Sequence, residues 1–126
     1  MKSNEDRHLP LQTETIQAYV VDAIGNDKEV FLQMVNLFLD SADNLHKEIV
    51  DGLATKDFSA ARRLAHSLKS SSLMFSAESL SALCAEAEAL AEKRQDAAIA
   101  LLLPRIRVEL DWLRLELPPF CAKMLQ

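Results

Sequence analysis

The sequence is poor in the residues that make turns and aromatic-rich sheets. It has two glycines among 126 residues, and aromatic side chains make up only 6% of it. Hydrophobic residues nonetheless reach 49%, and many of them are leucine and alanine, which favour helices. This composition predicts packed helices. The length allows one core and is too short for a catalytic domain plus a regulatory one, so we expect a single domain.

Cysteine is also scarce, and its placement indicates no metal or disulfide chemistry. Cys84 and Cys121 form no Cys-x-x-Cys pair and have no histidine at metal-ligand spacing, so we expect no metal site and no disulfide framework. Cys84 falls in an apolar helical stripe and is predicted to be a core thiol. No stretch approaches about 18 uncharged apolar residues, and the N-terminus lacks the apolar core of a signal peptide. We therefore expect a soluble, cytoplasmic chain without membrane contact.

Positive charge is limited as well. The net charge is −5, the sequence pI is about 5.1, and no run of lysine and arginine with interleaved aromatic residues occurs. Such a chain would be repelled by a phosphate backbone, which argues against a nucleic-acid partner. The two glycines, Gly25 and Gly52, are isolated, and this excludes a glycine-rich loop that cradles phosphate.

The first quarter of the chain predicts a lead-in and a brief helix. Residues 1–12 are polar and contain a proline, so we expect a flexible segment. Residues 13–24 have helical periodicity, and Gly25 ends them. Asn26, with Glu29 three residues on, is then expected to cap a long helix. That helix runs through about Thr55 with the apolar stripe Phe31, Met34, Phe38, Ala42, Leu45, Ile49 and Leu53.

Three further helices are predicted in the rest of the chain. Asp57 is placed to cap a helix over residues 58–76, and Ser76 to cap the next one. The last helix has the apolar stripe Ile99, Leu102, Leu103, Ile106, Leu110, Leu113 and Leu117. Pro118 and Pro119 are expected to stop it, and Pro104 inside it must kink or restart the helix because proline lacks a backbone donor.

Four amphipathic helices joined by short connections can bury their stripes together by packing side by side. The predicted fold class is therefore all-α: an antiparallel up-down four-helix bundle with a short N-terminal capping helix. We expect the bundle domain to span residues 13–120 and a C-terminal tail to follow at 121–126. One bundle can bury all of these apolar stripes, which predicts a monomer.

One histidine stands out on the helix over residues 58–76. On a helical wheel, His66 projects away from the apolar side. A neutral imidazole keeps one ring nitrogen free as a nucleophile, so an exposed histidine can accept a phosphoryl group without a base beside it. Lys69 is placed one turn on, where it can meet phosphoryl oxygens. The other residues near His66 on the wheel are Arg62, Arg63, Ser70 and Leu73.

The residues around His66 resemble the signature of the histidine-containing phosphotransfer (HPt) domain. The similar run is AHSLKSSSLMFSA, from Ala65 to Ala77, followed by LSALCAEAE. The upstream IGNDKEVFLQMVNLFLDSA is similar to the first long helix of that family, and the resemblance extends from about Ile16 to Leu117. The family most often has glycine at the positions of Ser70 and Ser76, where this chain has serine.

The resemblance implies a role in a two-component phosphorelay. His66 would accept a phosphoryl group from the phospho-aspartate of a receiver domain and pass it to a second receiver. Lys69 would stabilise the phosphoryl group, Ser70 would be the small residue beside the histidine, and Arg62, Arg63, Ser70 and Leu73 would help to bind the partner. The chain would be a phosphocarrier without a cofactor of its own, because Mg²⁺ is expected on the receiver. Partners would be response-regulator receivers and a hybrid sensor kinase, of which the chain could itself be a part.

Two other interpretations stay open. The chain could be a helical adaptor that only binds signalling partners, or the dimerisation and phosphoacceptor segment of a histidine kinase. In such kinases an acidic residue typically follows the histidine, whereas Ser67 follows His66 here. His8 and His46 lack a comparable setting and are expected to be structural or incidental. The carboxylates of Glu86 and Glu88, and those of Glu109 and Asp111, are two residues apart on helices and do not face each other, which argues against paired acid/base work.

Overall fold

The computed structural model describes residues 8–126, and every regular element among them is helical. Three short segments come first: α1 at Thr13–Ile16, a π-helical turn at Gln17–Val21 and α2 at Asp22–Ile24. Four long helices follow: α3 at Lys28–Ala54, α4 at Phe58–Met74, α5 at Glu78–Glu92 and α6 at Asp96–Met124. The all-α fold class is thus confirmed, and none of these helices is long and apolar enough to cross a bilayer.

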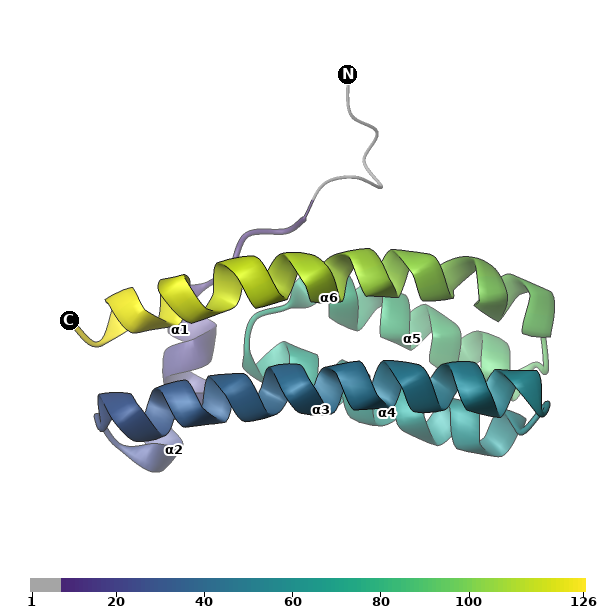
Figure 1. Cartoon of the computed structure of the whole chain (residues 1–126), viewed down its shortest axis with the longest axis horizontal. Helices are drawn as coiled ribbons and strands as arrows, with labels where there is room; N and C mark the ends of the chain where they lie inside the picture. The colour runs from purple at the N-terminus through teal and green to yellow at the C-terminus, as the bar shows by residue number, and fades with distance from the viewer. Residues whose placement is uncertain (1–7) are drawn as a thin grey trace, which may run out of the picture.

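The long helices lie side by side, and the chain reverses direction at each connection between them (Figure 1). α3 packs against α4 and α6, and α5 packs against the same two helices. α4 and α6 therefore occupy diagonal corners. The short N-terminal elements lie at the end of the long helices where the chain also terminates, and α1 contacts α4 there (Figure 1).

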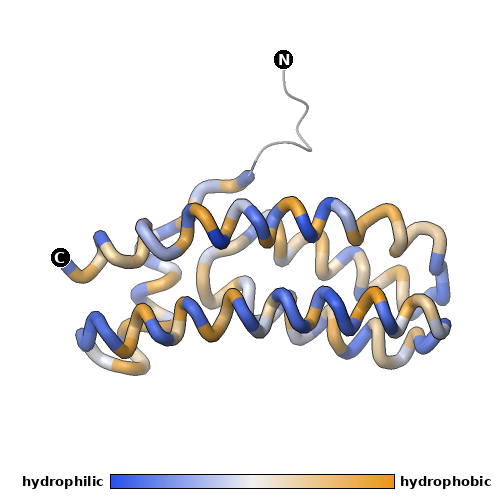
Figure 2. The backbone as a smooth tube through the Cα atoms, in the orientation of Figure 1, coloured by the Kyte–Doolittle hydropathy of each residue, from blue (hydrophilic) through white to orange (hydrophobic). Residues whose placement is uncertain are grey.

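Apolar and polar residues alternate along each long helix, which Figure 2 shows as orange and blue along the tube. The buried residues of these helices are mostly apolar. The side chains of Phe38 and Phe75 stack with ring centroids 4.6 Å apart and join α3 to the end of α4. The largest fully buried residues come from all the long helices and from the N-terminal turn: Phe31, Ile49, Leu68, Leu80, Ile99, Ile106, Leu110, Leu113, Leu117, Ile16, Val20 and Val21. All of these residues except Ile99 belong to one large core. Ile99 belongs to a second, smaller cluster with Phe58, Ala61 and Ala91.

Of the three helix caps that the sequence predicts, only the one at Asp57 is confirmed. Gly25 ends the brief N-terminal helix with a φ of 84°, a conformation that glycine adopts without steric cost. Asp57 caps α4 as expected, since its Oδ1 accepts a hydrogen bond from the amide of Ala60 at 3.0 Å. The cap expected at Asn26 is wrong. Asp27 caps α3, because its Oδ1 accepts from the amide of Val30 at 3.1 Å.

Ser76 does not cap α5, contrary to expectation. Ala77 is the residue that precedes that helix, and Ser76 adopts a left-handed conformation with a φ of 62°. Its buried hydroxyl accepts a hydrogen bond from the amide of Gln12 at 2.7 Å. This geometry explains why glycine suits the same position in the family that the sequence resembles, since a side chain there has to tolerate a positive φ.

The prolines of α6 neither end nor divide it. The helix is continuous past Pro104 and runs through Pro118 and Pro119 to Met124, so the expected stop and the separate C-terminal tail at 121–126 are wrong. Each proline leaves one carbonyl of the preceding turn without its usual amide donor. The packing beyond the prolines favours continuation, because Cys121 is fully buried. Phe120, Met124 and Leu125 also pack against the core.

The segment before α1 is attached to the bundle over its described part. His8 Nδ1 lies 2.7 Å from Oε2 of Glu109, and the imidazole stacks on Trp112 with ring centroids 4.5 Å apart. The amide of Leu9 donates to Oγ of Ser79 at 2.7 Å. Residues 8–12 are therefore tied to α5 and α6. The rest of the predicted lead-in, residues 1–7, lies outside the described residues.

Candidate functional site

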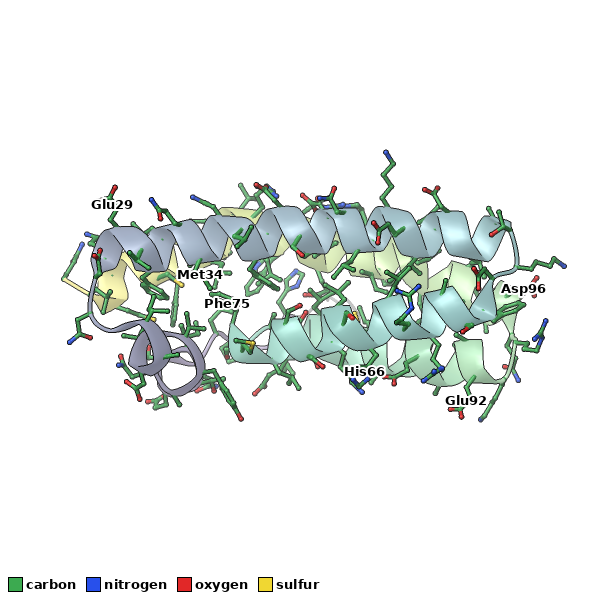
Figure 3. The ribbon with its side chains drawn as sticks, turned by 90° about the horizontal axis from the view of Figure 1, so that it is seen from below. Glu29, Met34, His66, Phe75, Glu92 and Asp96 are labelled. Carbon is green, nitrogen blue, oxygen red and sulfur yellow. The ribbon has the colours of Figure 1, made fainter. Side chains whose placement is uncertain are left out.

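His66 projects from the side of α4 that faces away from α3, whereas Phe75, which directly follows α4, lies between α3 and α4 (Figure 3). The side chain of His66 is 56% exposed. Five other residues of this segment, Ala61, Leu64, Leu68, Ser72 and Phe75, are buried on the opposite side. The helical period separates the two sets, because residues three and four apart share a face. The structure therefore places the imidazole in solvent, as the wheel predicts.

A carboxylate of the neighbouring helix joins His66 to Lys69. Oε1 of Glu88 lies 3.0 Å from Nδ1 of His66, and Oε2 of the same carboxylate lies 2.7 Å from Nζ of Lys69. The pKa of Glu88 lies below its usual value, mainly because Lys69 donates a hydrogen bond to the carboxylate. Burial raises this pKa, and the hydrogen bond from His66 lowers it again. Glu88 is thus held in its ionised form.

This contact decides which nitrogen of His66 carries the proton. An ionised carboxylate can only accept hydrogen bonds, so Nδ1 of His66 must be the donor. In the neutral ring the lone pair then resides on Nε2, which has no hydrogen-bond partner among residues 8–126. A nucleophilic nitrogen on an exposed ring is the result.

The other residues singled out by the sequence lie along the same outer face of α4. Arg62, Arg63 and Ser70 are exposed, and Leu73 is 47% exposed. The hydroxyl of Ser70 donates to the backbone oxygen of His66 at 3.1 Å, so it is folded back on its own helix and adds little bulk beside the ring. Neither arginine makes a salt bridge within residues 8–126. The face around His66 is therefore open, partly basic and partly apolar.

Glu88 is the functional candidate that the sequence argument missed. Within its own helix Glu88 is paired only with Glu86, two residues away, and side chains at that spacing do not face each other. The relevant partners lie on α4, which packs against α5 after a tight connection at residues 75–77. Ser81 Oγ lies 3.4 Å from the backbone oxygen of Lys69, which fixes this register. Residues at similar distances from the connection face each other, so this rule limits the partners of His66 to a few residues of α5. Only the packing of the two helices selects Glu88 among them.

The remaining histidines and cysteines have structural settings. Nε2 of His46 lies 3.0 Å from the backbone oxygen of Leu103, which ties α3 to α6. His8 binds Glu109, as described above. Cys84 and Cys121 are fully buried, and burial raises the pKa of each thiol to about 12, so the expectation of a core thiol at Cys84 is confirmed. Among residues 8–126, no group of three or more His, Cys, Asp or Glu side chains could hold a metal ion.

Comparison with known proteins points to one family. The family model of the Hpt domain matches residues 33–116, which is two thirds of the chain and contains His66, Lys69 and Glu88. No curated protein and no solved structure matches the chain.

Proposed function

Because the chain belongs to the Hpt-domain family, whose members are phosphocarrier modules, we propose that it relays phosphoryl groups between receiver domains of a two-component phosphorelay. The phospho-aspartate of one receiver donates to Nε2 of His66. A second receiver then takes the phosphoryl group from the same nitrogen. The observation that carries this proposal is the exposed imidazole whose Nδ1 is bound to Glu88, so that Nε2 is left free as the nucleophile.

Lys69 supplies the positive charge for the incoming phosphoryl group. Its Nζ is held by Glu88 next to the ring, and its side chain is 27% exposed, so it can reach an anion at the surface. A lysine ammonium is a mobile point charge that meets phosphate oxygens without a fixed geometry. The charge neutralised at this point favours both the bound phosphoryl group and the transfer state.

The outer face of α4 is the docking site for receivers in this proposal. Leu73 provides an exposed apolar contact about two helical turns after His66. Arg62 and Arg63 provide positive charge about one turn before His66. Ser70 keeps the approach to the ring open. A small interface with an apolar centre and a polar rim suits a transient encounter.

The chain contributes a nucleophile and a docking face, while the catalytic machinery belongs to its partners. Phosphoryl transfer is catalysed mainly by positioned cations and metal ions, and we assign the Mg²⁺ to the acidic site of the receiver. We further propose that the long helices form the antiparallel up-down bundle typical of the family, with α1 to α2 closing one end, and that the chain acts as a monomer.

The test is phosphoryl transfer from a panel of phosphorylated receivers to the wild-type chain and to His66→Gln. We expect labelling of the wild type, none of His66→Gln, and unchanged helical content in the variant, because an exposed residue contributes little to stability. His8→Gln is the matched control and keeps its labelling.

Each other result selects a different function. If receivers bind the wild type without labelling it, the chain acts as an adaptor. ATP-dependent self-labelling in a longer chain would favour the histidine-kinase segment. Labelling that persists in His66→Gln, or unfolding of that variant, would contradict the assignment of His66.

A further inference from the structure

The contact between Glu88 and His66 bears on what happens to the Nδ1 proton after phosphorylation. When the Nε2 lone pair of His66 forms a bond to phosphorus, the aspartyl oxygen–phosphorus bond of the donor breaks and its electron pair stays on the carboxylate. The ring keeps its Nδ1 proton in this step and becomes a phospho-imidazolium cation. It can then lose that proton to water and become a neutral phosphoramidate.

The two forms of the phosphorylated ring differ as donors. If Nδ1 is still protonated when the nitrogen–phosphorus bond breaks, the bonding pair returns to Nε2 and a neutral imidazole leaves. If Nδ1 has lost its proton, the leaving group is an imidazolate anion, which is a far stronger base and leaves more slowly. Onward transfer therefore depends on the proton at Nδ1.

We propose that Glu88 retains the Nδ1 proton of phosphorylated His66, so that the ring leaves as neutral imidazole in onward transfer. The inference rests on the proposed phosphocarrier function. The carboxylate accepts from Nδ1 at 3.0 Å and its own side chain is only 19% exposed, which limits screening by water. A cationic ring gains an ion pair there, whereas a deprotonated Nδ1 would turn a lone pair toward a negative charge.

The other charges around the ring do not replace Glu88. Lys69 is the nearest cation and by itself favours loss of the proton, yet its Nζ is bound to the second oxygen of Glu88 at 2.7 Å. On α4 the positive charges of the exposed Arg62 and Arg63 also favour loss of the Nδ1 proton. On α5 the negative charge of the exposed Glu86 favours its retention.

The other two elements that pack against α4, which are α3 and α1, add little charge near the ring of His66. On α3, which packs against α4, His46 is directed to the backbone oxygen of Leu103 on α6. Glu14 of α1, at the end of the bundle, is exposed. Among residues 8–126, Glu88 alone provides a carboxylate in hydrogen-bond contact with the ring.

Glu88→Gln is the decisive variant, because its amide oxygen can still accept from Nδ1 and only the negative charge is lost. The chain is phosphorylated chemically with phosphoramidate, and nitrogen-15 NMR follows the Nδ1 titration of phosphorylated His66. We expect the titration midpoint of Glu88→Gln to lie about one pH unit below that of the wild type. Glu86→Gln is the control and should shift the midpoint little. Lys69→Met removes a cation and should shift it upward.

Transfer from phosphorylated His66 to a receiver gives the functional readout. Above the midpoint, the rate for Glu88→Gln should be lower than that of the wild type by up to about tenfold, which corresponds to one pH unit. Below both midpoints the two rates should agree. Equal midpoints in Glu88→Gln and wild type, or a rate ratio that does not change with pH, would overturn the inference. Because phosphoramidate needs no receiver, the NMR result stands even if no receiver phosphorylates the wild type, which would instead count against the proposed function.

Discussion

Nζ of Lys69 and Oε2 of Glu88 lie 2.7 Å apart, so the cation beside His66 is already bound by a carboxylate of the next helix. The pair fixes the ammonium one turn from His66 in the resting protein. It also means that an arriving phosphoryl group must share or take over this cation. In the proposed function, this competition between Glu88 and the phosphoryl group limits how much Lys69 contributes to the transfer rate.

Lys69→Ala should slow phosphoryl transfer to His66 without abolishing it. The nucleophile and its tautomer remain, while one charge-assisted contact to the phosphoryl group is lost, and we expect the rate to fall about tenfold. Rapid-quench measurement of label transfer from a phosphorylated receiver gives the rate. Lys93→Ala, at the exposed end of α5, is the control. An unchanged rate for Lys69→Ala would remove Lys69 from the mechanism.

Asp43 joins α3 to α6 and should make the stability of the bundle depend on pH. Its two oxygens each lie 2.7 Å from a guanidinium nitrogen, one of Arg107 and one of Arg114. Partial burial alone would raise the pKa of Asp43, but the hydrogen bonds to the two arginines hold this pKa below its usual value of 3.8. A carboxyl with a lowered folded-state pKa stabilises the protein above its unfolded-state pKa, and this contribution is lost as the pH falls through the folded-state value.

We therefore expect Asp43→Asn to lower the free energy of unfolding by about 1 kcal/mol at pH 7, and the difference from wild type to shrink below about pH 4. Urea denaturation of both proteins at pH 7 and at pH 2.5 measures this difference in the free energy of unfolding. Asp40→Asn is the control, because Asp40 is 71% exposed and, within residues 8–126, its one salt bridge is to Arg114. A difference that persists undiminished at pH 2.5 would contradict the ionic origin.

The end of α6 should be part of the folded unit. Cys121 is fully buried and Phe120, Met124 and Leu125 pack against the core. Removal of residues 118–126 exposes the surfaces that they cover, and we expect it to lower the free energy of unfolding by about 2–4 kcal/mol. Removal of Gln126 alone, which is exposed, should have little effect. Urea denaturation compares the three chains, and equal midpoints would mean that the helix beyond Leu117 adds no stability.

Ser76 combines a cost and a gain that two substitutions can separate. The left-handed φ of 62° disfavours any side chain by about 1 kcal/mol, whereas the hydroxyl accepts from the amide of Gln12. Ser76→Ala keeps the cost and loses the hydrogen bond, so we expect a loss of about 1–2 kcal/mol. Ser76→Gly loses both, and the two changes should nearly cancel. Thermal denaturation should rank alanine below glycine, and the opposite order would show that the backbone conformation is not what limits this position.

The sequence by itself determined the class of fold and the residue that faces solvent. Helical periodicity depends on neighbours three and four positions apart, so the long helices, the outward placement of His66 and the cap at Asp57 could be read from local pattern. The same local signals misplaced the cap of α3 by one residue, since Asn26 and Asp27 can both cap and only the path of the chain after Gly25 selects one.

Tertiary structure alone decided three features. Burial of Cys121 carries α6 past Pro118 and Pro119, where local rules end a helix. The connection between α4 and α5 imposes a positive φ on Ser76 and sets the register of the two helices. That register brings Glu88 to His66 across 22 positions of sequence, and no periodicity within one helix could show it, because the contact depends on how two helices pack.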